Sequence, residues 1–313
     1  KEGVEVKLLY DDIGCMATLK GNYTKRLRKL GIDAHKFNKV VPRLTVAYNT
    51  RDHRKILVID GQIGYTGGVN LADEYINQRE RFGHWKDSAV RLDGRAVKAL
   101  TRLFLMNWYI NQGEIEDFDK YHMENQAVDG EGFYIPFGSG PKPIYKSQVG
   151  KAVYQNIINQ ATDYVYITTP YLIIDYDLTE DIRNAALRGV DVRIVTPSIP
   201  DKKLIQIVTR GAYPDLMEAG VKIYEYTPGF IHSKQVLADD EVAVVGTINF
   251  DYRSLVHHYE NAVWMYRSPE LTKIRTDFEE IFSVSQQIKL DTFRITWYQY
   301  LIKEIMQLFA PML

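Results

Sequence analysis

The sequence predicts an α/β protein of two similar halves related by a duplication. Three observations predict this class. The chain has 313 residues, enough for two domains. Helical patterns alternate with short strand-like runs. The order of these elements recurs along the chain. Hydrophobic residues make up 45% and charged residues 25%, which excludes the disordered and low-complexity classes.

The first elements to recur are a helix end, a glycine and a strand. Residues 3–10 (GVEVKLLY) resemble residues 189–196 (GVDVRIVT), and residues 27–32 (LRKLGI) resemble residues 216–221 (LMEAGV). In each copy the glycine ends a helical pattern, and the residues after it alternate between apolar and polar. We therefore expect a strand after each of these glycines.

The next repeated element is a set of four polar residues with the same spacing in both halves. A histidine is followed by a lysine two positions later, an aspartate seven positions later and an asparagine 17 positions later. The two sets are His53, Lys55, Asp60 and Asn70, and His232, Lys234, Asp239 and Asn249. Strand-like runs flank each aspartate. We therefore predict a hairpin with the histidine and lysine on one face of its first strand and the asparagine just past the second.

The residues between and beyond the repeats predict the domain limits. Glycines and prolines interrupt the pattern at residues 130–143, after a helical stretch at 96–111, which predicts a first domain of residues 1–132 and a second of 133–313. The second half has an apolar strand at 164–169 and a helix ahead of Gly189. The first half has no counterpart of either, so the repeat predicts a first domain truncated at its N-terminal side.

The end of the chain and its single cysteine are less informative. Residues 293–313 form an amphipathic helical pattern that either packs on the second domain or lies at a membrane interface. No apolar run is long enough to span a bilayer. Cys15 is the only cysteine, which excludes an intrachain disulfide and a cysteine-rich zinc site.

The duplicated polar residues are suited to phosphate chemistry at one shared site. Two lysines and two amides can neutralise and hydrogen-bond a phosphate, one imidazole can attack phosphorus, and the other can protonate the leaving oxygen. This chemistry requires no metal. A nucleophilic imidazole needs an acceptor at its second nitrogen. Asp87, downstream of His53, and Glu260, downstream of His232, are candidates, although spacing alone fits surface acids equally well.

Both motifs resemble those of the phospholipase D superfamily, and their surroundings resemble bacterial cardiolipin synthases. The superfamily likeness lies in the two His-x-Lys-x-x-x-x-Asp motifs and in residues 67–70 (GGVN) and 246–254 (GTINFDYRS). The narrower likeness is carried by residues 48–55 (YNTRDHRK), 68–75 (GVNLADEY), 84–87 (HWKD), 139–141 (SGP) and 169–171 (TPY).

This resemblance implies an α/β fold of two similar phospholipase D-like α-β-α sandwich domains with pseudo-two-fold symmetry, each a sheet between helices. It also implies a set of residue roles. His53 would form a phosphohistidine, and His232 would serve as general acid and then general base. The residues that would hold the phosphoryl oxygens are Lys55, Lys234, Asn70 and Asn249. Asp60 and Asp239 would be structural, Asp87 and Glu260 would orient the histidines, and Gly68 and Thr247 would contact substrate. The resemblance implies no cofactor and no metal.

The implied reaction joins two phosphatidylglycerol molecules into cardiolipin and releases glycerol. The expected partners are this phospholipid and a membrane surface, with homo-oligomers left open and no nucleic acid. The expected location is the bacterial cytoplasmic membrane, with a transmembrane anchor in the full-length protein. A hydrolase that uses water as acceptor, a phosphodiester nuclease and a non-catalytic lipid-binding scaffold are the alternatives. The net charge of −1 argues against the nuclease, and two intact motifs argue against the scaffold.

Overall fold

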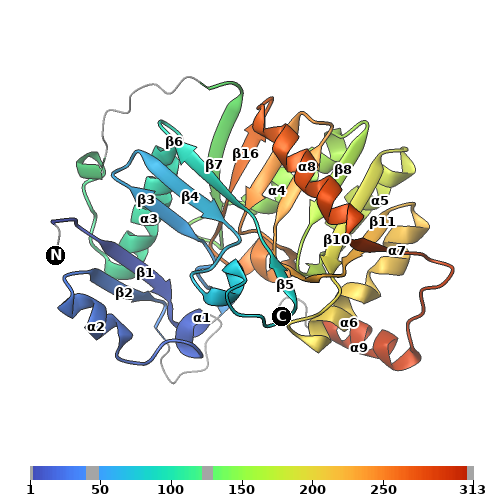
Figure 1. Cartoon of the computed structure of the whole chain (residues 1–313), viewed down its shortest axis with the longest axis horizontal. Helices are drawn as coiled ribbons and strands as arrows, with labels where there is room; N and C mark the ends of the chain where they lie inside the picture. Colours follow the sequence, from blue (N-terminus) through green and yellow to red (C-terminus); the bar gives the residue numbers. More distant parts are fainter. Residues whose placement is uncertain (1–2, 40–48, 122–129, 309–313) are drawn as a thin grey trace.

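The computed structural model describes residues 3–39, 49–121 and 130–308, which form a mixed α/β fold. Figure 1 shows the two halves side by side, with the first half (blue to teal) at the left and the second (green to red) at the right. The strands β5 (His84–Lys86), β7 (Phe133–Ser139) and β16 (Glu260–Tyr266) lie where the halves meet.

The second half contains an eight-stranded sheet in the order β17-β11-β10-β8-β13-β14-β16-β7. The strands β8, β10 and β11 run parallel, and the other neighbouring pairs are antiparallel. The bounds of the strands not yet given are β8 (Tyr164–Thr168), β10 (Asp191–Pro197), β11 (Lys222–Tyr226), β13 (Gln235–Ala238), β14 (Val242–Gly246) and β17 (Ser285–Ile288). The short strands β9 (Leu172–Ile173) and β15 (Phe250–Asp251) pair beside this sheet.

Helices cover both faces of the large sheet, and this explains the near-continuous apolar sequence of its central strands. Alternate residues of β8 enter two different clusters: Val165 and Ile167 pack with one set of helices, and Tyr164 and Tyr166 with the other. The first set comprises α4 (Val149–Gln160), α5 (Tyr176–Leu187) and α7 (Tyr213–Glu218). The second comprises α8 (Glu270–Ser283) and α3 (Val97–Gln112). Because α3 belongs to the first half, the two halves share this second part of the core.

The first half repeats this arrangement in two smaller sheets. One is the parallel pair β1 (Lys7–Asp11) and β2 (Asp33–Phe37), and the other is β3 (Ile56–Ile59), β4 (Ile63–Gly67) and β6 (Ala89–Asp93). The pair β1 and β2 corresponds to β10 and β11. The strands β3, β4 and β6 correspond to β13, β14 and β16. In the second half, β8 pairs with β10 on one side and β13 on the other and so connects the two groups into one sheet. Among the described residues of the first half, no strand pairs with both β1 and β3. The short helices α1 (Asp12–Met16) and α2 (Tyr23–Lys29) complete this half.

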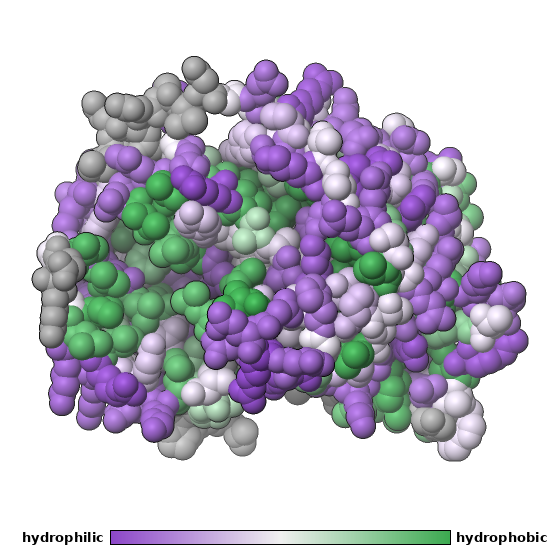
Figure 2. Space-filling view, in the orientation of Figure 1, coloured by the Kyte–Doolittle hydropathy of each residue, from purple (hydrophilic) through white to green (hydrophobic). Residues whose placement is uncertain are grey.

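The place that corresponds to β8 exposes apolar side chains. Leu57 and Ile59 of β3 are 55% and 43% exposed. Figure 2 shows hydrophobic surface gathered over β1, β3 and β4. These side chains lie where β8 covers the equivalent strand of the second half.

The motif aspartates lie in hairpin turns. Asp60 and Asp239 have φ values of 51° and 54°, and Gly61 and Asp240 follow with 65° and 53°. Three residues separate the paired strands in each hairpin, and the third donates its N–H to the last strand carbonyl, Gln62 to Ile59 and Glu241 to Ala238. The Asp239 carboxylate accepts hydrogen bonds from the backbone N–H groups of residues 162, 163 and 164, at the start of β8. Asp60 is exposed and has no such partner among the described residues. We therefore propose a structural role for Asp239, as the resemblance implies.

Three sequence expectations differ in detail from the structure. The break expected at 130–143 contains β7, which pairs with β16 at the edge of the large sheet. The helix expected at 96–111 is α3, and the strand expected at 4–10 is β1, which begins at Lys7. The terminal helix α9 (Trp297–Leu308) packs on α6 (Lys203–Gly211), where the buried Lys303 lies against Gly211. Among the described residues, no helix has the length and hydrophobicity needed to cross a membrane.

Candidate active site

Two backbone connections between the halves fix the position of the motif histidines. The backbone N–H of His53 donates to the carbonyl of Tyr259 at 2.9 Å, and that of His232 donates to the carbonyl of Lys86 at 2.7 Å. A parallel bridge between Asp52 and Tyr259 supports the first connection. Pairing of β5 with β12 (Gly229–Ile231) supports the second. Each histidine is therefore held against the residue that precedes an acid of the other half.

The two candidate acids bind the histidines across the junction. His53 Nδ1 lies 2.9 and 3.0 Å from the two carboxylate oxygens of Glu260, and His232 Nδ1 lies 2.7 Å from Asp87 Oδ2. Spacing along the chain groups Asp87 with His53 and Glu260 with His232, whereas the structure pairs them across the halves. With Nδ1–H donating to a carboxylate, each imidazole keeps its Nε2 lone pair available.

Thr247 and Gly68 occupy equivalent positions in the two motifs, and each lies against the acid of its own half. The fully buried Thr247 donates its hydroxyl hydrogen bond to Glu260. A Cβ on Gly68 would lie only 2.0 Å from a carboxylate oxygen of Asp87. Both residues therefore help to fix the position of the acid in their own half. We therefore propose a positioning role for them in place of the substrate contact that the resemblance implies.

Each motif lysine contacts the backbone of the histidine in its own motif. Lys55 Nζ donates to the carbonyl oxygen of His53 at 2.6 Å, and Lys234 Nζ donates to that of His232. Lys55 directly precedes β3, and Lys234 directly precedes β13. The prediction that the histidine and lysine lie on the first strand of each hairpin is therefore wrong. The chain is held there by the connections to the other half instead. Each ammonium retains two further N–H groups for an anion.

Burial and neighbouring charge change the protonation of this cluster. Burial lowers the pKa of Lys234 to about 7 and that of Lys55 to about 8. Burial, assisted by the charge of Lys234, lowers the pKa of His232 to about 3, and burial also lowers the pKa of His53. The charge of Lys55 lowers the pKa values of both Lys234 and His232. The two motifs therefore form one electrostatic site, and both imidazoles are neutral near pH 7.

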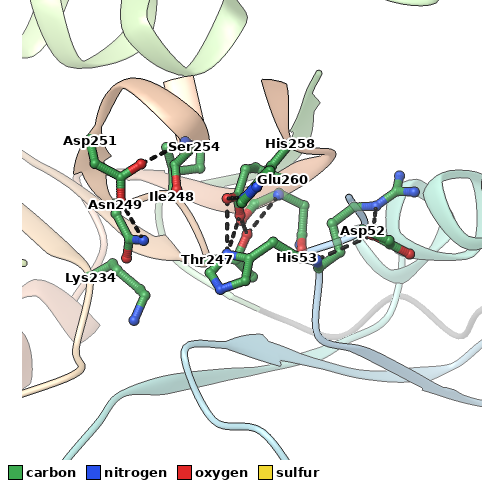
Figure 3. Close-up of polar contacts among 12 residues, drawn as sticks. Asp52, His53, Lys234, Thr247, Ile248, Asn249, Asp251, Ser254, His258 and Glu260 are labelled. Carbon is green, nitrogen blue, oxygen red and sulfur yellow. Dashed lines mark hydrogen bonds and ion pairs between the residues drawn. The ribbon is translucent and has the colours of Figure 1, made fainter. Parts of the chain in front are cut away.

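The motif asparagines follow β4 and β14, as predicted, and their amides are held by neighbours. Asn70 Nδ2 donates to Tyr75 Oη at 2.5 Å, and Asn249 Nδ2 donates to Asp251 Oδ2 at 2.9 Å. The Oδ1 atom of Asn249 is buried and has no hydrogen-bond partner among the described residues. Figure 3 shows Asn249 and Lys234 on the same side of the His53 ring. Each amide nitrogen retains a second N–H for a bound oxyanion.

Aromatic rings surround His232, and a second imidazole lies beside His53. The ring centroids of Tyr75, Trp85 and Phe230 lie 5.2, 5.5 and 6.0 Å from that of His232. The ring of His258 lies 5.7 Å from that of His53. The sequence motifs do not include His258, and they include Trp85 only within residues 84–87, without a role. Their shared signal is position, because each stands two residues before an orienting acid.

His258 contacts the same carboxylate as His53. Its Nδ1 atom lies 3.6 Å from Glu260 Oε1, and its side chain is 13% exposed. Neither ring nitrogen has a hydrogen-bond partner within the part of the chain that the structure describes. Figure 3 shows His258 and His53 both directed toward Glu260. Glu260 is therefore shared by two imidazoles, whereas Asp87 serves one.

Comparisons with known proteins agree with this architecture. A family profile described as "Cardiolipin synthase, PLD-like domain" matches residues 154–282. An uncharacterized protein of Streptococcus mutans is 47% identical over all of this chain, which covers 68% of that protein. A cardiolipin synthase of Alkalihalophilus pseudofirmus is 37% identical over all of this chain, and the chain spans 62% of its length.

The fold is also shared with a solved structure. The crystal structure of phosphatidylserine synthase from Haemophilus influenzae matches with a TM-score of 0.69 and 14% sequence identity, covering 98% of this chain and 80% of that one. This likeness confirms the predicted phospholipase D-like fold. The profile match and the sequence relatives show that this chain is similar to cardiolipin synthases with a phospholipase D-like domain.

Proposed function

We propose that this chain carries the active site of a phosphatidyltransferase that condenses two phosphatidylglycerol molecules into cardiolipin and glycerol. The observation that carries the proposal is the crossed pair of carboxylate–imidazole contacts, His53 with Glu260 and His232 with Asp87, beside the buried Lys234 and the half-buried Lys55. Such a site has a nucleophile, a proton carrier and cations for a phosphodiester. Relatives named cardiolipin synthase, which are longer than this chain, support this choice of reaction.

In the first step of the proposed reaction, His53 Nε2 attacks the phosphorus of one phosphatidylglycerol. The bond from phosphorus to the glycerol oxygen breaks, and His232 gives its proton to that oxygen. In the second step His232 takes the proton from a hydroxyl of the second phosphatidylglycerol. The resulting oxygen displaces His53 and forms cardiolipin. Glu260 stabilises the charge on the His53 ring, and the lysines stabilise the equatorial oxygens.

The low pKa of His232 fits this cycle because substrate changes its surroundings. Burial and the positive charge of Lys234 keep the imidazole neutral before substrate binds. A bound phosphodiester brings a negative charge beside the lysines, which offsets their effect and raises the pKa of His232. The proton for the leaving glycerol is therefore taken up together with the substrate.

Analysis of lipid products tests the proposed function. We would incubate the full-length enzyme with phosphatidylglycerol vesicles and identify the products by mass spectrometry. Cardiolipin and glycerol are the expected products. Phosphatidic acid and glycerol would mean that water is the acceptor and the protein is a hydrolase. A well-folded enzyme that produces neither would overturn the assignment, and nucleic acid would be the next phosphodiester to test.

Anion binding is expected to weaken as pH rises. The lysine pKa values of about 7 and about 8 mean that both ammonium groups lose protons between pH 7 and 9 in the free protein. Because the bound anion favours the protonated forms, affinity should fall toward tenfold per pH unit for each lysine. Calorimetric titration with dimethyl phosphate, whose charge is constant over this range, measures the effect. A Lys234→Met variant should show a shallower slope. A flat profile for the unmodified protein would contradict the expectation.

Replacing Glu260 by glutamine is expected to lower kcat by roughly 10³- to 10⁴-fold, because an amide neither stabilises a charged imidazole nor fixes its tautomer. Steady-state kinetics on a phosphodiester measures the loss. Glu225→Gln is the matched control, since Glu225 is a buried acid paired with Arg210 at 2.7 Å. That variant should lose stability and keep kcat. Equal losses of kcat in the two variants would show that Glu260 acts only through stability.

A further inference from the structure

We propose that His53, His258 and Glu260 form an inhibitory binding site for a divalent transition-metal ion, best suited to Zn²⁺, at the edge of the active site. Binding of the ion follows from the geometry of these three residues alone. Inhibition by the ion rests in addition on the proposed function, in which His53 is the nucleophile.

The distances within this trio suit a small four-coordinate ion. One ligand atom from each of the three residues lies within 4.8 Å of the other two. Zn²⁺ bonds of 2.0–2.1 Å in a tetrahedron need ligand atoms roughly 3.3 Å apart. The separation from Glu260 Oε1 is 2.9 Å for His53 Nδ1 and 3.6 Å for His258 Nδ1, on either side of that value. Within the described ranges no hydrogen bond fixes the His258 ring, so a small rotation about its side-chain bonds would bring Nδ1 nearer to the other two ligand atoms.

The donors and their surroundings also suit this ion. Two neutral imidazoles and one carboxylate form the ligand set of catalytic-type zinc sites, which leave the fourth position open. The hydroxyl of Thr247 holds the carboxylate from behind, as outer ligands do in built metal sites. His53 is 25% exposed, which leaves a route for the ion from solvent.

The other half of the molecule provides an internal comparison. There the equivalent trio is His232, Asp87 and Trp85, with Trp85 two residues before the acid as His258 is before Glu260. Indole offers a hydrogen-bond donor and no metal ligand. The histidine at 258 therefore confines the proposed metal site to one half, beside His53.

A metal ion here would switch the tautomer of His53. In the free protein Nδ1 carries the ring proton toward Glu260, and Nε2 keeps the lone pair that attacks phosphorus. When the ion takes the Nδ1 lone pair, the neutral ring carries its proton on Nε2. No lone pair then faces the substrate. One bound ion per chain is thus sufficient to stop the first chemical step.

Metal titration of the whole, tag-free protein without lipid tests the binding. We would measure Co²⁺ by its visible absorption and Zn²⁺ by calorimetry, in the unmodified protein, His258→Asn and His257→Asn. His257 is the adjacent histidine outside the trio, so its variant is the matched control. We expect one ion per chain in the unmodified protein and in His257→Asn, and at least tenfold weaker binding in His258→Asn. Equal affinity in His258→Asn, or no binding to the unmodified protein, would overturn the site.

Activity measurements separate the inhibition from the proposed function. Zn²⁺ should stop lipid turnover by the unmodified protein and by His257→Asn, and a chelator should restore it. Each protein is compared with its own rate in the absence of metal, and the His258→Asn variant should keep the fraction of that rate that the other two proteins lose at the same Zn²⁺ concentration. Bound metal without inhibition would overturn the tautomer switch. Absence of all turnover without metal would overturn the proposed function, while the binding results would still decide whether the site exists.

Discussion

Replacement of His53 by alanine is expected to lower phosphodiester turnover by at least ~10⁴-fold, the scale of loss when the attacking group of a covalent mechanism is removed. Steady-state kinetics with phosphatidylglycerol in vesicles measures the change. The reason is specific to this ring, since His53 is the imidazole that bonds both oxygens of the buried Glu260. Its removal leaves the lysines and the other imidazole in place.

His35→Ala is the matched control for this loss. His35 also lies in the first half and bonds an acid, Asp33, at 2.7 Å, but it stands on β2 outside the site. We expect its variant to keep kcat within about twofold, in line with the small effect of most surface substitutions. Turnover by a folded His53→Ala protein at near the unmodified rate would refute the role of His53 as nucleophile.

The His232→Ala variant is expected to trap a covalent intermediate when the leaving group needs no proton. With bis(p-nitrophenyl) phosphate, nitrophenolate leaves unaided, so His53 can still attack phosphorus. The second step needs a base to activate the acceptor, and that base is absent. A burst of one nitrophenolate per chain should be followed by turnover slowed by roughly 10²- to 10⁴-fold.

Intact-protein mass spectrometry, after quenching in base, locates the trapped group. We expect one nitrophenyl phosphate adduct per His232→Ala chain, attached to His53. The same treatment of His53→Ala should give no adduct. An adduct on His232 in the His53→Ala variant would reverse the two roles, which the pseudo-symmetry of the site allows in principle.

Much of the fold could be predicted because its signals are local. The strands of the second half are buried on both faces, so their apolar runs stand out from the sequence. The hairpin turns at Asp60 and Asp239 have equally local causes. The strand β7 was not predicted because Pro136 and Gly138 within it indicate a break. An edge strand tolerates proline, since one side of it needs no hydrogen-bonded partner.

The pairing of acids with histidines could not be predicted from spacing. His53 and Glu260 lie 207 positions apart, and His232 and Asp87 lie 145 apart. Their contact depends on backbone hydrogen bonds at the junction, which leave no periodic signal. His258 escaped for a related reason, because its importance depends on a carboxylate that it shares with a residue of the other half.

Because of the crossed contacts, catalytic activity should depend directly on the packing of the two halves against each other. Each half holds a histidine whose acid belongs to its neighbour, so neither half has an oriented imidazole by itself. A small opening of the junction would unpair both dyads together, long before either sheet melts. Mild heat or denaturant should therefore abolish activity while the secondary structure is still intact. Substitutions at the junction should lower activity as substitutions in the site do.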